Sequence, residues 1–78
     1  MKTDILNKMI ERAKTRKNGV YSANGYKYGV VGGRMIYFIE NKAIYQRVGN
    51  FVTPLSAPFD YEFNAIKALK KFMETGKI

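Results

Sequence analysis

Five basic side chains lie close together near the start of the chain: Lys8, Arg12, Lys14, Arg16 and Lys17. Ammonium and guanidinium groups bind phosphates, so these residues are the first candidates for contact with a polyanion. The 78 residues include 14 basic and 6 acidic side chains, for a formal net charge of +8. Ten basic and three acidic groups fall in residues 1–49, against four and three in the remainder. The basic excess is therefore local, which favours a binding surface.

The spacing of this run predicts a stripe. On a helix, Lys8, Arg12 and Arg16 at i, i+4 and i+8 lie along one line beside the apolar face. Lys14 would project from the opposite flank, and Lys17 would fall near the helix end. The stripe suits a phosphate backbone, while the alternative is that these cations only keep the surface soluble.

Tyrosines interleave with further cations in the middle of the chain. If strand alternation holds, Tyr26 and Tyr28 share one face with Val30, and Tyr45 shares a face with Arg47. The same rule puts Met35, Tyr37 and Ile39 on one face of their strand. Such a sheet face, with Lys27, Arg34 and Arg47 at its edges, can stack unpaired bases or bind another protein. The alternative is that the rings pack under the helices with their hydroxyls at the rim.

Catalytic side chains are scarce. The chain has no histidine and no cysteine, which removes the usual general base, thiol nucleophile and common metal ligands. Its carboxylates lie on predicted helices near lysines or helix starts, apart from one in a turn, and no two form an evident acid pair: Asp4, Glu11, Asp60, Glu62, Glu74 and, in the turn, Glu40. We therefore expect a non-catalytic protein with no cofactor and no metal.

The elements that carry these residues follow from periodicity. From Thr3 to about Thr15 the apolar residues keep the 3,4 spacing of an amphipathic helix, with Thr3 as its N-cap. Asn18-Gly19 is the predicted left-handed stop. A second helix runs from about Phe59 to Thr75 and ends at Gly76. Its apolar arc is so wide that we expect it to be the central core element, between the sheet and either the first helix or another subunit.

Between the helices, short β-branched and aromatic runs alternate with turn signals. The predicted strands are Val20–Ala23, Tyr26–Val31, Met35–Ile39, Ala43–Val48 and Phe51–Thr53. Asn24-Gly25 is the strongest hairpin signal, and Gly32-Gly33 suits a two-residue connection. Gly29 is expected at a bulge or a close backbone approach. The predicted fold is a single α+β domain over residues 1–78: an N-terminal helix, an antiparallel β-meander of three to five strands and a C-terminal core helix.

Parts of the sequence resemble three known families. Gly19-Val20-Tyr21 followed by Tyr28-Gly29 and Arg34 resembles the opening of GIY-YIG nucleases, although the second motif lacks its isoleucine. The order α-β-β-β-α resembles the double-stranded-RNA-binding domain, but Asp60 and Glu62 stand where that family has a lysine cluster. The segments 21–28 and 49–53 resemble the three-stranded DNA-binding domains of AP2 type and of phage integrase amino termini, without their arginine- and tryptophan-rich strands. None of these likenesses amounts to membership.

Two functional hypotheses follow. The first is a small nucleic-acid-binding domain that acts through the basic stripe and the aromatic and basic sheet face, with the type of nucleic acid undetermined. The second is a protein-binding inhibitor or modulator of the kind that phages and mobile elements encode, docking on an acidic or nucleic-acid-binding surface. Lack of cysteine and of a long apolar run favours a cytoplasmic protein with no membrane span. Homodimerisation is an alternative that the sequence leaves open.

Overall fold

The structure is a computed structural model that describes residues 3–76. Its elements are α1 (Thr3–Ala13), β1 (Gly19–Ala23), β2 (Tyr26–Val31), β3 (Arg34–Glu40), β4 (Ala43–Val48), β5 (Phe51–Pro54) and α2 (Glu62–Thr75). All neighbouring strands pair antiparallel in the order β1-β2-β3-β4-β5. The predicted α+β meander between two helices is confirmed. No helix among residues 3–76 is long and apolar enough to cross a membrane.

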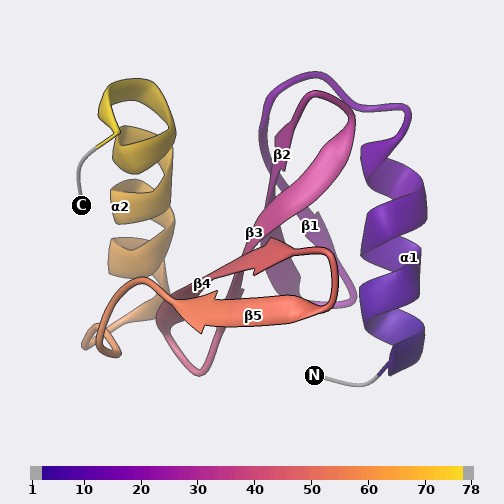
Figure 1. Ribbon diagram of the computed structural model, residues 1–78. Coiled ribbons are helices and arrows are strands. Elements are labelled where there is room, and N and C mark those ends of the chain that lie inside the picture. The colour runs from indigo at the N-terminus through magenta and orange to yellow at the C-terminus, as the bar shows by residue number, and fades with distance from the viewer. Residues whose placement is uncertain (1–2, 77–78) are drawn as a thin grey trace.

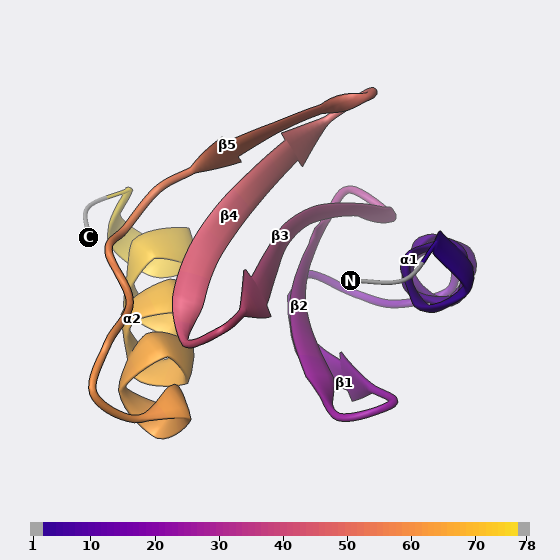
Figure 2. The ribbon, with the colours of Figure 1, turned by 90° about the horizontal axis from the view of Figure 1, so that it is seen from below.

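The sheet lies between the two helices, as both views show (Figures 1 and 2). On one side α1 packs against β1 and β3, and on the other α2 packs against β1 and β4. The second helix is a core element, as predicted, but it does not lie between the sheet and the first helix, because the sheet is the middle layer. Strand residues are apolar on both faces: Phe38 belongs to the cluster under α1, whereas its neighbour Ile39 belongs to the cluster under α2. A sheet with two apolar faces needs a cover on each of them.

Two-residue turns set the strand register. Asn24 and Gly25 both have positive φ, 51° and 83°, which is the backbone of a type I′ turn. Gly32-Gly33 and Asn41-Lys42 repeat this pattern. These turns bring Ala23 opposite Tyr26, Val31 opposite Arg34 and Glu40 opposite Ala43. The hairpins at Asn24-Gly25 and Gly32-Gly33 are confirmed.

A β-bulge interrupts β3. Gly29 is opposite Tyr37 while Val30 is opposite Met35, so Ile36 is an extra residue without a cross-strand partner. The bulge reverses side-chain alternation, which leaves Met35 in the α1 cluster and sends Tyr37 and Ile39 to the α2 cluster. The prediction that Met35, Tyr37 and Ile39 share a face was therefore wrong. Gly29 does allow a close approach, since a Cβ there would lie 3.0 Å from the Met73 sulfur.

Each helix closes one half of the core. Met9 and Ala13 of α1 are fully buried against a cluster of the sheet that includes Tyr28, Val30 and Met35. Across the sheet, Ala65 and Leu69 of α2 are fully buried with Ile39 and Ile44, and Phe72 makes an edge contact with Tyr37 at 5.3 Å between ring centroids.

The helix ends differ from the predicted ones. Thr3, the first residue that the structure describes, is already helical and is not a cap outside the helix. α1 ends at Ala13, so Asn18-Gly19 is not its stop. α2 begins at Glu62 after an N-cap at Tyr61, because the preceding segment is held in another way: the Phe59 amide donates to the carbonyl of Lys42. Gly76 ends α2 in the left-handed conformation, as expected.

Candidate nucleic-acid interface

The segment after α1 carries Lys14, Arg16 and Lys17 outside the helix. Local hydrogen bonds order it: the Arg16 amide donates to the carbonyl of Ala13, and the Tyr21 hydroxyl donates to the carbonyl of Lys17 at 2.7 Å. The Arg16 guanidinium lies over the Tyr21 ring, 5.2 Å from its centroid. Arg16 is therefore not the third member of a helical stripe, but its position is fixed by β1.

Three of the predicted site residues meet at one place. Lys14, Arg34 and Arg47 line a groove of about 330 Å³ between the end of α1 and strands β3 and β4, and we call it the basic groove. The rest of its lining is mostly apolar and includes Ile10, Met35, Ile36 and Val48. The cations come from the α1–β1 connection, from the start of β3 and from β4, and only the fold brings them together.

The conformation of the groove follows from the elements around it. Arg34 directly follows the Gly32-Gly33 turn and is exposed, while Arg47 is half-buried. A Cβ at Gly33 would come within 3.8 Å of the Lys14 carbonyl oxygen, so the turn lies against the end of α1. The Lys14 ammonium pairs with Glu11 at 3.0 Å, and both side chains are well exposed. An exposed ion pair of this kind is weak, so the Lys14 ammonium group can leave Glu11 and bind another anion.

The predicted stripe and the basic groove lie on different flanks of α1. Ile10 lines the groove, and Arg12, two residues further, points about 200° away on a helix. Lys8 and Arg12 are exposed on that outer flank. Arg16 lies beyond the end of α1, over the ring of Tyr21 in β1. The structure thus separates Lys8 and Arg12 on the outer flank of α1 from Arg16 at Tyr21 and from the basic groove.

The tyrosines do not form an open stacking platform. Tyr28 is fully buried under α1, Tyr26 and Tyr45 pack half-buried at the same cluster, and Tyr37 lies on the opposite face under α2. Tyr45 stacks on Phe38 instead, with centroids 5.2 Å apart. Packing under helices, the alternative weighed from the sequence, accounts for these four rings. Lys27 is half-buried on the β2 face opposite Tyr26 and Tyr28, away from the basic groove.

The residues of the nuclease-like motif are arranged for packing. Tyr21 and Tyr28 lie 5.9 Å apart between ring centroids, but the Tyr28 hydroxyl is buried and cannot meet a substrate. The stretch after Gly33 is strand β3. Within residues 3–76, no three acidic side chains gather in a way that could hold a metal ion.

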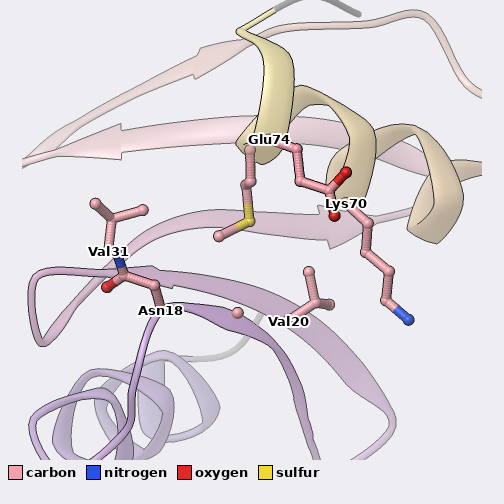
Figure 3. A pocket seen from close by; sticks show the side chains of 7 residues that line it. Asn18, Val20, Val31, Lys70 and Glu74 are labelled. Carbon is pink, nitrogen blue, oxygen red and sulfur yellow. The ribbon is translucent and has the colours of Figure 1, made fainter.

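A second pocket, of about 380 Å³, lies between the start of β1 and the last turns of α2 (Figure 3). Asn18, Val20 and Val31 form one wall, and Lys70 and Glu74 face them from α2. The Asn18 side chain has a structural role, since its amide oxygen accepts a hydrogen bond from the Gly32 backbone amide at 2.9 Å. With one cation and one carboxylate, this pocket has no charge preference comparable to that of the basic groove.

An exposed apolar edge of the sheet was not predicted from the sequence. β5 is the last strand of the sheet, and all four of its residues are exposed. Phe51 is 80% exposed, and Val48 across the hairpin is 60% exposed. The alternation of β5 is that of an ordinary strand, so only the structure shows that no element within residues 3–76 covers it.

Comparison with known proteins adds no relative. No protein-family model, curated protein sequence or solved structure matches this chain.

Proposed function

We propose that this protein is a small nucleic-acid-binding domain that contacts phosphates through the basic groove. The observation that carries the proposal is the meeting of Lys14, Arg34 and Arg47, from three separate parts of the chain, around one groove. Cations dispersed for solubility have no reason to converge in this way. Phosphate neutralisation also accounts for the net charge of +8, which attracts any polyanion at long range.

Order in the surrounding backbone supports the proposal. The connection that carries Lys14, Arg16 and Lys17 is tied to β1 by the Tyr21 hydroxyl and to the β2–β3 turn by the Asn18 side chain. Cations on an ordered backbone lose less conformational entropy when they bind. Lys8 and Arg12 extend the positive surface around the other flank of α1, and together with Arg16 beside Tyr21 they contribute further phosphate contacts.

The test is the salt dependence of binding. Replacing Lys14, Arg34 and Arg47 together by Gln should weaken binding and reduce the slope of log K against log salt by about 2 for single strands, from about 0.7 per lost phosphate contact. Affinities are measured by fluorescence anisotropy over a series of salt concentrations. Replacing Lys8, Arg12 and Arg16 by Gln tests the stripe in the same way.

A matched control comes from α2. Lys67, Lys70 and Lys71 are exposed on the other side of the sheet, so replacing them by Gln removes the same charge from a surface outside the proposal. This variant should keep the slope of the wild type. An equal loss of slope in both triple variants would show that only net charge matters.

The exposed edge favours a second function, a protein-binding modulator. Phe51 and Val48 provide an apolar surface at β5, whose outer edge pairs with no other strand among residues 3–76, and such edges bind extended segments of partner proteins. A single stoichiometric protein that survives nuclease treatment in a pull-down and is lost with Phe51→Ser would support this function. Recovery of nucleic acid alone supports the first.

A further inference from the structure

We propose that the basic groove holds one unstacked nucleotide, with its phosphate among Lys14, Arg34 and Arg47 and its base over the apolar floor. This inference rests on the proposed function and makes it narrower, because it implies a preference for single strands over duplexes. Three observations lead to it: the composition of the floor, the position of the β3 bulge at that floor and the size of the groove.

The floor has more apolar surface than a phosphate needs. Ile10, Ile36 and Val48 line the groove together with the buried Met35, and none of them can pair with an anion. The cations stand around these side chains. A ligand that uses both parts has an anionic group joined to a flat, weakly polar body, which is the chemistry of a nucleotide.

The bulge in β3 lies at this floor. Its extra residue, Ile36, and the neighbouring Met35 both line the groove. Bulges often serve to redirect a side chain beside a binding site.

Size and access decide between duplex and single strand. The groove, about 330 Å³, is at the lower end of the range of small-ligand sites, so it suits one nucleotide and not a helix. In a duplex the base faces are stacked on their neighbours and cannot reach an apolar floor, whereas a single strand can turn a base outward. The aliphatic floor makes no base-specific hydrogen bonds, so we expect little sequence preference.

The experiment compares three probes of one length, about twelve nucleotides, which lies within the site sizes known for small single-strand-binding folds. The probes are oligothymidylate, an abasic strand with the same phosphates, and a duplex. The wild-type protein should bind oligothymidylate about fivefold more tightly than the abasic strand, since the base adds contact with the floor. It should also prefer oligothymidylate to the duplex. An oligouridylate measured in parallel shows whether the protein prefers ribose or deoxyribose. Tight binding of either single strand agrees with the proposed nucleotide site.

Val48→Glu adds a carboxylate at the floor and should abolish the preference for bases. Val48 is exposed, so the fold should tolerate the change, and thermal melting checks this. Phe63→Glu is the matched control: it also replaces an exposed apolar residue by an acid, but on α2. It should retain the preference.

Equal binding of oligothymidylate and abasic strand, or equal loss of the preference in the two variants, would overturn the nucleotide site while leaving phosphate binding intact. Absence of salt-dependent binding to all probes would instead overturn the proposed function itself.

Discussion

The Tyr28 hydroxyl is the one buried side-chain polar atom without a hydrogen-bond partner among residues 3–76. The Tyr28 ring is fully buried in the cluster under α1, so the hydroxyl loses its contacts with water and gains none in return. A buried polar group in this state lowers stability. Tyr28 is therefore a packing residue with a polar atom in excess, which is the opposite of a binding tyrosine.

Tyr28→Phe should raise the free energy of unfolding by about 1 kcal/mol, since it removes an unpaired hydroxyl and keeps the ring. Urea denaturation followed by tyrosine fluorescence measures the change. Tyr21→Phe is the control, because that hydroxyl donates to the carbonyl of Lys17. Its loss should lower stability by up to about 1 kcal/mol. A fall in stability for Tyr28→Phe would mean that its hydroxyl has a partner in solution.

Among the elements, the β3–β4 hairpin has the least suitable residue at its turn. Asn41 and Lys42 both have positive φ, 52° and 65°, as a type I′ turn requires. Asparagine tolerates this conformation, but a lysine in it is strained by its Cβ. In the Asn24-Gly25 turn, by contrast, glycine occupies the second position and adopts positive φ without strain. The β3–β4 pairing therefore holds Lys42 in a backbone conformation that lysine disfavours.

Lys42→Gly relieves the strained conformation and should thereby stabilise the protein by about 1 kcal/mol. The greater conformational entropy of glycine in the unfolded chain offsets part of this gain. Lys42→Ala keeps the strained Cβ and should leave stability close to that of the wild type. Thermal unfolding by circular dichroism compares the two. Lys42 does not line the basic groove, so nucleic-acid binding should change only as far as one lost charge requires. Equal stability of both variants would contradict the argument from φ.

The whole molecule is compact around a shared sheet. Its radius of gyration, 11.3 Å, is close to the value of about 11.5 Å expected for this length. Its core is divided into a cluster under α1 and a cluster under α2, on opposite faces of the same five strands. Neither cluster is large, and the chain has no cysteine for a disulfide. Since each helix covers a face that the same strands share, the halves should not unfold independently.

Met9→Ala and Leu69→Ala each open a cavity in one cluster and should each lower the free energy of unfolding by about 2–5 kcal/mol. In each variant, far-ultraviolet circular dichroism and tyrosine fluorescence should report one coincident transition. Lys67→Ala, at an exposed position of α2, should change stability little. Separate transitions in Met9→Ala would show that α1 and its cluster unfold on their own.

The sequence by itself determined the elements and most of their connections. Periodicity located both helices and all five strands, and glycine and asparagine pairs fixed the hairpins, because these signals are local. It also named Lys14, Arg34 and Arg47 as candidate binding residues, and the structure places these three around one groove. Helix ends were less well determined: the segment before Glu62, where α2 begins, is held by the backbone bond from the Phe59 amide to the distant Lys42 carbonyl, which residue spacing does not indicate.

Only the tertiary structure decided which residues share a surface. One extra residue, Ile36, reverses the faces of β3, and no local signal distinguishes a bulge from a regular strand. The helices took opposite faces of the sheet because its strands are apolar on both sides. In the resulting arrangement, the tyrosines that we expected to stack bases pack under the helices, and Lys14, Arg34 and Arg47 lie around one groove. Such a site depends on long-range packing, which residue spacing does not specify.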